Sequence, residues 1–367
     1  MKFPLDLVYC SDCSLVQITE TVEPSILFST YLYCSSFADT TLANARALVE
    51  KLIEKRKLGS ESLAAEIASN DGYLLQYYHK EGINVLGIEP AQNIAVMARQ
   101  KGINTISEFF GKELAKKLVK QKTRADVVHA NNVLAHVSDL NGLVEGIYDF
   151  LKDDGLAVIE VPYLQPMLAH TEFDTIYHEH LCYFSLTALD RLFTSHKLFI
   201  NDVERLEIHG GSIRLFIEKA EARTEAVKGL LAQEKSDGVL TAKYYAAFAE
   251  KVENLRRELL ELLTKLKNEG QRVAVYGASA KGSTLMNYFG IGKDLVEYVV
   301  DRSTVKQGFF TPGTHLQIFP PEKLLSDRPD YVVLLTWNFA DEILAQQKEF
   351  RQAGGKFIIP IPDLKVV

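Results

Sequence analysis

Residues 63–75 read LAAEIASNDGYLL, an apolar run that passes through small and polar residues into a second apolar run. The first run has the length of a buried strand, and the residues after it are typical of a turn. Similar strand patterns occupy residues 83–90, 125–132 and 156–163, and helical patterns lie between them at 93–102 and 142–155. This alternation predicts a parallel, doubly wound sheet with helices on both faces.

The pattern then changes. Residues 199–208 and 212–219 read as two strands joined by the turn HGG at 209–211, which predicts an antiparallel hairpin that closes the sheet. Residues 220–269 contain almost no Gly or Pro and place leucines at helical spacing, so we expect connecting helices there. From residue 271 onward the strand and helix patterns alternate again, which predicts a second α/β domain.

The composition excludes several classes of function. The chain has 367 residues, a formal net charge of -7 and no block of Lys or Arg, which argues against a nucleic-acid surface and favours a small-molecule partner. Its first residues lack the features of a secretory signal, and no apolar run approaches the roughly 18 residues that a membrane helix needs. We expect a cytoplasmic monomer without a membrane partner, whose 4 cysteines stay reduced.

The turn after the first strand is a candidate cofactor loop, because ligands of doubly wound sheets bind beyond the carboxyl ends of the strands. Glu66 lies at the end of that strand, and Glu89 ends the next one, in place to accept hydrogen bonds from ribose hydroxyls. The loop departs from the dinucleotide pattern G-x-G-x-x-G, and Asp71 would repel a pyrophosphate. These features favour a cationic cofactor without phosphate, such as S-adenosylmethionine. The turn itself comprises Ala68, Ser69, Asn70, Asp71 and Gly72.

A third candidate element is HANNVLAHVSDL at residues 129–140, which follows another predicted strand. On their own, Asn131 and Asn132 read as helix caps and His136 as a surface residue. Because this loop ends at the same edge of the sheet as the cofactor loop, Asn131 is also a candidate cofactor ligand. His136 is likewise a candidate active-site residue.

Residues 174–186, DTIYHEHLCYFSL, concentrate histidines and tyrosines after the last parallel strand. A metal site is the weaker interpretation, because His178 and His180 share a face only in an extended chain, where Glu179 points away. Acid–base chemistry needs one histidine of near-neutral pKa, oriented by a neighbour such as Glu179, and a tyrosine that can bind a developing oxyanion. A polar loop anchored by its own side chains is an equal alternative.

Three further motifs leave their roles open. YGASAKGS at 276–283 offers backbone N–H groups and Lys281 to a phosphate, and Asp301 closes the next strand, as in an NAD(P)-dependent oxidoreductase. At the hairpin, His209 and Arg214 read either as satisfied edge residues or, for Arg214, as a group that reaches an anionic substrate. The pair Cys10 and Cys13 looks like half of a zinc site, whose structural form needs four ligands.

The motifs LVYCSDCSLVQ, YLYCSS, EIASNDGYLL, YHEHLCYFS, HGGSIRLF and YGASAKGS occur in the order seen in the sugar C-methyltransferases. The chain resembles this family over nearly its whole length. The resemblance implies S-adenosylmethionine-dependent methylation of C3 in a nucleotide-linked 4-keto deoxysugar. It also implies a zinc-binding remnant at 1–36, a class I methyltransferase domain at 37–220, connecting helices at 221–270 and a Rossmann-like substrate domain at 271–367.

The resemblance also implies roles for single residues. His180 becomes the base that removes the C3 proton, Tyr177 and Glu179 its companions, and His136 a neighbour of the keto group. Tyr31 or Tyr33 is expected to cover the substrate. Further candidate substrate residues are Tyr33, His178, His209, Arg214, Ser279 and Lys281. The family has two Cys-x-x-Cys pairs, and this chain begins just before the second, so zinc stays open, as does a binding protein that has lost its chemistry.

Overall fold

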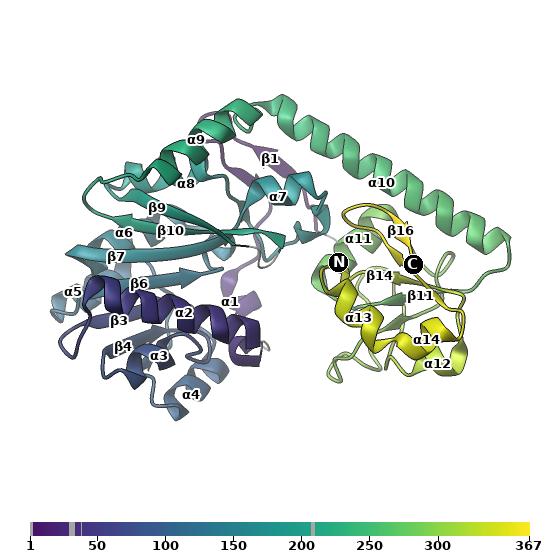
Figure 1. Ribbon diagram of the computed structural model, residues 1–367, viewed down its shortest axis with the longest axis horizontal. Coiled ribbons are helices and arrows are strands. Elements are labelled where there is room, and N and C mark those ends of the chain that lie inside the picture. The colour runs from purple at the N-terminus through teal and green to yellow at the C-terminus, as the bar shows by residue number, and fades with distance from the viewer. Residues whose placement is uncertain (1–2, 29–33, 38, 207–209) are drawn as a thin grey trace. The chain divides into compact units, whose positions relative to one another are not determined.

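The computed structural model describes residues 3–28, 34–37, 39–206 and 210–367 (Figure 1). Three candidate residues, Tyr31, Tyr33 and His209, lie outside the described residues. The chain folds into two compact units. The seven-stranded unit comprises residues 6–163 and 181–240, and the six-stranded unit comprises 164–180 and 241–367 together with the start of the chain.

The seven-stranded unit confirms the predicted doubly wound sheet. Its strands lie in the order β5-β4-β3-β6-β7-β10-β9, and the chain reverses its direction of progress between the neighbours β3 and β6. β3 to β7 are parallel, whereas β10 is antiparallel to both of its neighbours. Ligands bind at such a reversal point, beyond the strand ends. The strands are β3 (Leu63–Ile67), β4 (Asn84–Ile88), β5 (Thr105–Ile106), β6 (Ala125–Asn131), β7 (Leu151–Pro162), β9 (Phe199–Leu206) and β10 (Ser212–Glu218).

Helices cover both faces of this sheet. Leu48 and Leu52, one helical turn apart on α2, pack against Val127, Val158 and Phe216 of the strands, and α3 adds its own buried residues on the same side. α5 and α6 lie behind the sheet in the view of Figure 1. The helices are α2 (Asp39–Arg56), α3 (Leu75–Lys80), α4 (Gln92–Gln100), α5 (Lys112–Lys120), α6 (Leu140–Phe150), α8 (Leu186–Ser195) and α9 (Glu225–Asp237).

The helix expected over 142–155 ends earlier, at Phe150. Leu151 already pairs with Ala125 in the sheet, so pairing with the neighbouring strand overrides the local helical pattern. The predicted hairpin is confirmed: β9 and β10 pair antiparallel from Leu206 and Ser212 onward, and Gly210 and Gly211 of the turn have positive φ.

A small antiparallel sheet joins the start of the chain to the middle. β1 (Leu7–Tyr9) pairs with β2 (Val16–Ile18), and β2 pairs with β8 (Cys182–Tyr183). α1 (Pro24–Phe28) and the 3-10 turn η1 (Ser35–Phe37) follow β2 in the chain. The segment that carries the two candidate zinc ligands therefore depends on a strand from far along the sequence.

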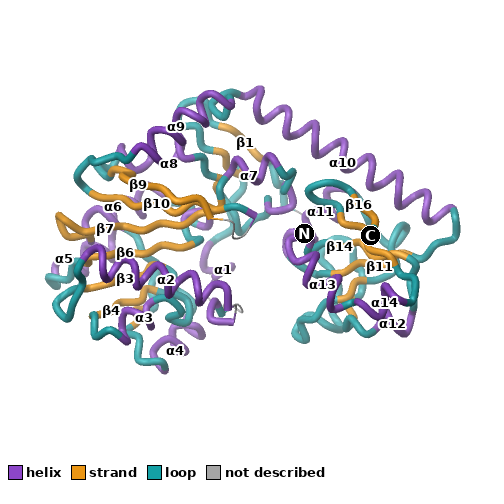
Figure 2. Tube along the Cα trace, in the orientation of Figure 1, coloured by secondary structure: helices purple, strands orange, loops and turns teal. Residues whose placement is uncertain are grey.

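The six-stranded unit has a second parallel sheet, in the order β13-β12-β11-β14-β15-β16, in which only β16 is antiparallel to its neighbour. Figure 2 shows strands of this unit in orange and its helices in purple. Its core joins strand residues to Leu324, Ile343 and Phe350 of three helices. The strands are β11 (Val273–Tyr276), β12 (Val299–Val300), β13 (Ile318–Phe319), β14 (Tyr331–Leu334), β15 (Lys356–Ile359) and β16 (Lys365–Val366). The helices are α10 (Ala242–Asn268), α11 (Ala280–Phe289), α12 (Lys323–Asp327), α13 (Ala340–Gln346) and α14 (Lys348–Gln352).

One segment lies with the six-stranded unit although the sequence placed it in the methyltransferase domain. Leu164–His180 contains α7 (Leu164–Ala169) and the 3-10 turn η3 (Phe173–Thr175). The Phe173 ring stacks on Phe289 of α11 with centroids 4.9 Å apart. This apolar contact, across more than a hundred residues of sequence, accounts for the grouping.

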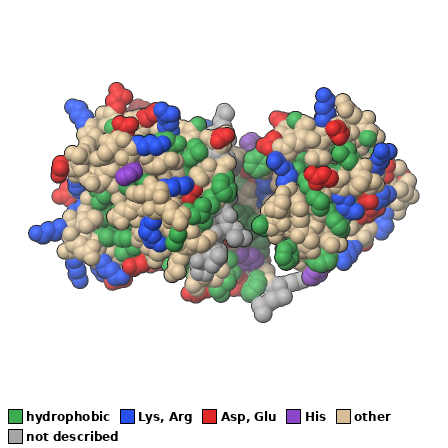
Figure 3. All heavy atoms as spheres, turned by 90° about the horizontal axis from the view of Figure 1, so that it is seen from below, with side chains coloured by type: hydrophobic (Ala, Val, Ile, Leu, Met, Phe, Trp, Pro, Cys, Tyr) green, Lys and Arg blue, Asp and Glu red, His purple; other side chains and the backbone are tan. Residues whose placement is uncertain are grey.

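The surface carries charges of both signs. On the face shown in Figure 3, blue and red side chains are interspersed and form no large patch of one sign. Along the portion of the chain that the structure describes, no helix is both long and apolar enough to cross a bilayer.

Candidate active site

The candidate cofactor loop leaves β3 through a sharply bent backbone. Ala68, Asn70 and Gly72 have φ values of 52°, 49° and 80°, in the left-handed region. The neighbouring strand has Gly87 beside the loop, where a Cβ atom would lie 2.6 Å from the Ser69 hydroxyl. The absence of a side chain on β4 therefore lets this loop pack closely against the next strand.

Glu89, at the end of β4, holds the loop in place. Its two carboxylate oxygens accept hydrogen bonds from the backbone N–H of Asn70, at 2.9 Å, and of Ala91, at 2.8 Å. Burial raises the pKa of this carboxyl above its ordinary value, and the two N–H donors oppose the rise. The predicted ribose acceptor thus lies next to the predicted cofactor loop.

Several buried polar atoms at this strand edge have no hydrogen-bond partner among the described residues. They are both carboxylate oxygens of Glu66, the Ser69 hydroxyl, Oδ1 of Asp71 and Oδ1 of Asn131. Burial raises the pKa of Glu66 well above its ordinary value, and the nearby Tyr73 hydroxyl partly offsets that effect. Buried polar atoms are normally paired, so this group has the capacity to bind polar atoms of a ligand.

The surroundings of Asp71 weaken one reason for preferring a cofactor without phosphate. Oδ2 of Asp71 accepts a hydrogen bond from Lys101 at 2.8 Å and another from the Ser36 hydroxyl. The ammonium group partly neutralises the carboxylate, so repulsion of a pyrophosphate is smaller than the sequence suggested. Asn70 accepts from the backbone N–H of Ser35 at 2.9 Å, so the loop also holds η1.

The histidines in and after β6 differ in environment. His129 is fully buried on β6, where Nε2 lies 3.0 Å from the Tyr78 hydroxyl and burial lowers its pKa to about 3. It is therefore a neutral core histidine. His136 ends a 3-10 turn, η2 (Leu134–His136), and is half-buried. The following helix is capped by Asp139, which accepts from Gly142, and not by the predicted asparagines.

The His180 ring is held at both nitrogens. Nδ1 lies 3.2 Å from the backbone oxygen of Thr175, and Nε2 lies 3.2 Å from the Tyr177 hydroxyl. A carbonyl oxygen only accepts, so the Nδ1 atom carries hydrogen, and in the neutral ring the lone pair is on Nε2. The Tyr177 ring also packs on the imidazole, with centroids 4.4 Å apart.

The residues next to His180 in the sequence have separate environments. The half-buried Glu179 has a pKa that burial raises, and the ring nitrogens of His180 contact Thr175 and Tyr177. His178 donates from Nε2 to the Pro4 carbonyl at 2.9 Å, so the two histidines have different partners. The next residue, Leu181, donates to Ala135, one residue before His136.

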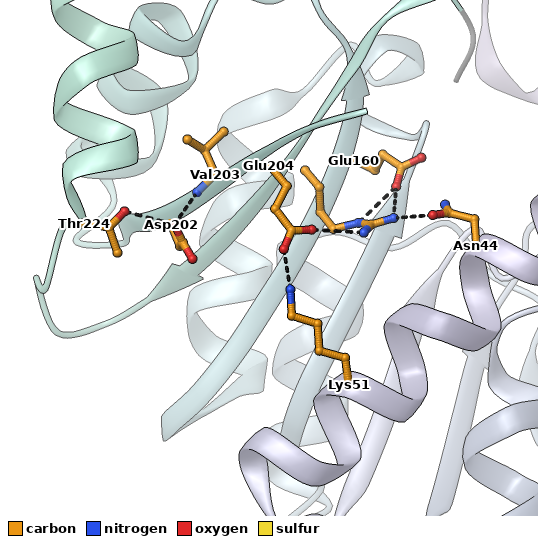
Figure 4. A network of polar contacts seen from close by, with 8 residues as sticks. Asn44, Lys51, Glu160, Asp202, Val203, Glu204 and Thr224 are labelled. Atoms are coloured by element: carbon orange, nitrogen blue, oxygen red, sulfur yellow. Dashed lines mark hydrogen bonds and ion pairs between the residues drawn. The ribbon is translucent and has the colours of Figure 1, made fainter. Parts of the chain in front are cut away.

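Arg214 belongs to a polar network on the seven-stranded sheet, and Figure 4 labels its partners Glu160, Glu204 and Asn44. Its guanidinium group donates to Glu160 at 3.0 Å, to Glu204 at 3.2 Å and to Asn44 at 3.0 Å. Lys51 pairs with the other oxygen of Glu204. Because Arg214 is only 5% exposed and its nitrogens are engaged, this geometry favours a structural role over the predicted contact with an anionic substrate.

The second loop uses its polar groups internally. The Ser279 hydroxyl caps α11 by accepting from Gly282 at 3.1 Å. Asp301 accepts from the backbone of Ala278 at 2.7 Å and of Ser303 at 2.8 Å, where a dinucleotide site would use it for ribose. Lys281 lies 4.1 Å from the centroid of the Trp337 ring and donates to a neighbouring asparagine.

Cys10 and Cys13 lie in the tight turn between β1 and β2. The backbone N–H of Cys13 lowers the pKa of the Cys10 thiol. Burial raises the pKa of Cys182 to about 12, and Cys13 is near enough to add to that rise. No group of three or more His, Cys, Asp or Glu residues within the described ranges is placed to hold a metal ion. A structural zinc site needs four ligands, and Cys10 and Cys13 supply two.

Sequence reasoning missed Glu234. This fully buried residue of α9 accepts hydrogen bonds from the Tyr163 hydroxyl at 2.8 Å and from the backbone of Leu186 at 2.6 Å. Its second oxygen accepts from the backbone and hydroxyl of Thr187. Glu234 thereby ties the end of β7 to the first turn of α8. The only signal in the sequence was a carboxylate on the apolar side of a predicted helix.

Two family models match separate parts of the chain. Residues 39–198 match the methyltransferase domain, and residues 207–362 match the C-methyltransferase C-terminal domain. The seven-stranded unit thus has the class I methyltransferase fold, and the protein is a methyltransferase.

A curated relative narrows this class. The chain is 38% identical over 368 residues to the C-methyltransferase NovU of Streptomyces niveus, covering 100% of this chain and 88% of the relative. The chain belongs to the C-methyltransferase family.

Solved structures are more distant. Magnesium protoporphyrin IX methyltransferase ChlM from Synechocystis PCC 6803, solved with bound SAM, is 11% identical over 49% of this chain and 79% of its own, with a TM-score of 0.38. The PH0226 protein from Pyrococcus horikoshii OT3 is 14% identical over 54% of this chain and 96% of its own, with a TM-score of 0.42. We assign the family from the sequence matches alone, since structural likeness this low carries no functional weight.

Proposed function

We propose that this C-methyltransferase transfers a methyl group from S-adenosylmethionine to C3 of a nucleotide-linked 4-keto deoxysugar, leaving S-adenosylhomocysteine. The observation that carries the proposal is the His180 ring, whose Nδ1–H is held by a backbone carbonyl and whose Nε2 has a lone pair for a proton. The substrate class rests on the family resemblance of the motifs around this residue. A monomer in the cytoplasm that binds a nucleotide sugar belongs to the same proposal.

The loop after β3 fits the methyl donor. Bound S-adenosylmethionine supplies an electrophilic methyl group on a positively charged sulfur. Glu66, Ser69 and Asp71 offer buried acceptor atoms that have no partner within the described part of the chain, and Glu89 lies at the next strand end, where ribose hydroxyls bind in such folds. Carboxylates near a cation lower its energy, and Asn131 adds a further acceptor at the same edge.

The base follows from what carbon methylation needs. A carbon atom attacks the methyl group only as a carbanion, and a ketone at C4 makes the neighbouring C3 proton removable because the charge moves to the ketone oxygen. His180 takes this proton on Nε2, and the Tyr177 hydroxyl, released from that nitrogen, donates to the enolate oxygen. Glu179 and His136, together with Tyr31, Tyr33, His178, Ser279 and Lys281 on the substrate side, keep their predicted roles within this proposal.

The proposal is tested with a panel of nucleotide-linked keto sugars, using mass spectrometry to measure methyl transfer. We expect His180→Ala to lower turnover by about 10³-fold, the range for loss of a general base, and to leave S-adenosylmethionine affinity within about twofold. His196→Ala, at a half-buried histidine that contacts Asn141, is the matched control and should behave as wild type.

Three results would count against this function. A His180→Ala variant that keeps most of its turnover removes His180 as the base. Wild-type protein that binds S-adenosylhomocysteine but methylates no keto sugar points to a binding protein without chemistry. Tight NADH binding without any response to the sulfur compounds supports the oxidoreductase alternative.

A further inference from the structure

The segment that carries His180 is fastened to the six-stranded unit at η3. Phe173 stacks on Phe289 with an interplanar angle of 15° and also contacts Tyr288, both at the end of α11. The Thr284 hydroxyl, on the same helix, donates to the backbone oxygen of Ile176 at 3.2 Å. These contacts lie on either side of Asp174 in the sequence.

The Trp337 side chain makes a polar contact with Asp174. Its indole N–H donates to Oδ2 of Asp174 at 2.8 Å, and Asp174 is fully buried. Lys281 lies over the indole ring at 4.1 Å and donates to Asn338, so the ring is held on one face as well as at its N–H group. A hydrogen bond to a buried carboxylate is stronger than a neutral one and fixes both groups.

Asp174 is the residue next to Thr175, whose carbonyl oxygen is the acceptor for Nδ1 of His180. The position of one peptide group is set by the residues on both of its sides, because only two dihedral angles per residue are free. Trp337 therefore fixes the turn from which the carbonyl points at the imidazole. If that carbonyl moves, the ring loses the contact that places its hydrogen on Nδ1 and its lone pair on Nε2.

We propose that Trp337, acting through Asp174, is a positioning residue that holds His180 as the Nδ1–H tautomer, with the ring lone pair on Nε2 beside the Tyr177 hydroxyl. The inference rests on the proposed function, in which His180 is the base. It adds a role for the six-stranded unit: besides its predicted part in holding the nucleotide sugar, this unit orients the group that removes the proton.

Nitrogen NMR of the imidazole side chains tests the proposal in the full-length protein without any substrate. The His180 signals are assigned by their loss in His180→Gln. We expect the neutral wild-type ring to give the Nδ1–H pattern, and Trp337→Phe, which keeps an aromatic ring but removes the N–H donor, to raise the Nε2–H fraction several-fold. With an accepted keto sugar, kcat should fall about 10-fold while KM stays within about twofold, as for a misplaced catalytic group.

Further variants separate positioning from general damage. Asp174→Asn keeps an acceptor for the indole and should retain more of the Nδ1–H pattern than Asp174→Ala. Tyr298→Phe removes a hydroxyl from another buried ring of the same unit, one that contacts Phe319, and should leave the His180 signals unchanged. If Trp337→Phe does not fold, Thr284→Val replaces it, with the same direction of change expected.

Wild-type His180 signals in folded Trp337→Phe overturn the proposal, whether or not turnover falls. A shift of equal size in Tyr298→Phe overturns it as well, since the effect would then be unspecific. These outcomes are distinct from failure of the proposed function. If His180→Ala stays active, His180 is not the base, yet the NMR comparison still decides whether Trp337 orients its ring.

Discussion

The two strand-to-helix loops of this protein, 68–72 and 277–281, are each held by a carboxylate from the next strand end. They differ in how many buried polar atoms remain without a partner among the described residues. In the first, Glu89 accepts from a loop N–H and from the N–H two residues after itself, and in the second, Asp301 does the same. The first loop retains Ser69 and Asp71 with buried atoms that have no partner among the described residues. In the second loop, the Ser279 hydroxyl accepts a hydrogen bond from Gly282 and caps α11.

This difference shows why one strand-end acid is a poor guide to a ligand site. The backbone contact of Glu89 and Asp301 is needed to hold the loop, so it occurs whether or not a ligand binds. The loops differ in the buried polar atoms that still lack a hydrogen-bond partner among the described residues. Gly277–Lys281 contributes no buried partnerless atom of this kind, although the neighbouring Tyr276 and Thr336 each contribute one.

The largest effect on stability is expected in the Arg214 network, where each guanidinium nitrogen already has a hydrogen-bond partner. Arg214→Met leaves Glu160, which is 3% exposed, as a buried charge without its cation. Breaking one side of such a pair costs about 3–5 kcal/mol, and we expect that loss in urea unfolding. Lys219→Met, at a cation directly after the same strand that pairs with the exposed Asp153, should cost under about 1 kcal/mol. An Arg214 variant of near wild-type stability with a raised KM would instead restore the substrate role.

The next largest effect is on cofactor affinity, and it distinguishes Glu89 from Asp301. Glu89→Ala removes an anion that holds two backbone N–H groups, and we expect S-adenosylmethionine to bind about 100-fold more weakly in calorimetry. Asp301→Ala removes the corresponding anion from the other loop and should change that affinity by less than about twofold. Equal losses in the two variants would show that both loops serve the methyl donor.

A smaller effect concerns pH and Asp174, beside the second loop. Burial raises the pKa of Asp174 to about 6 from an ordinary value of 3.8. Between these values the folded protein holds a proton that the unfolded chain has released, so this contribution to stability is present below about pH 4 and is lost as pH rises to about 6. Relative to Asp174→Asn, the wild type should therefore lose on the order of 2 kcal/mol between pH 4 and 7. A difference that is flat or rises with pH contradicts this environment.

The smallest effect compares two serines at equivalent places. Ser279→Ala removes the cap of α11 and should cost about 1 kcal/mol in thermal or urea unfolding. Ser69→Ala removes a hydroxyl that has no partner among the residues the structure describes, so the unliganded protein should lose less than about 0.5 kcal/mol while its affinity for S-adenosylmethionine falls. If both variants lose the same stability, the two serine hydroxyls do not differ in hydrogen bonding as described.

Much of the fold could be predicted because its signals are local. The buried strand at Leu63–Ile67 and the hairpin turn at Gly210 and Gly211 follow from runs and turn residues within a few positions. The strand start at Leu151 was missed, because the pairing with Ala125 that decides it comes from elsewhere in the chain. Short strands such as Thr105–Ile106 carry too few residues to show a period.

In the candidate site, too, the features with local sequence signals could be predicted and those set by distant residues could not. Residue types in the cofactor loop could be named from the sequence, but their remaining hydrogen-bond capacity depends on Lys101 and Gly87, which belong to other elements. The support of His180 by Thr175, and of that turn by Trp337, joins residues whose types carry no sequence signature. The same holds for Glu234, whose partners lie far from it in the chain.

The small sheet formed by β1, β2 and β8 can be completed only late in synthesis of the chain. Gln17 pairs with Cys182, so β1 and β2 emerge from the ribosome long before their third strand exists. A nascent two-stranded hairpin is only marginally stable in water, and an unpaired strand edge invites wrong partners. The cysteine turn therefore acquires its final environment only after the chain has been made past residue 183, when the segment with His180 is complete as well.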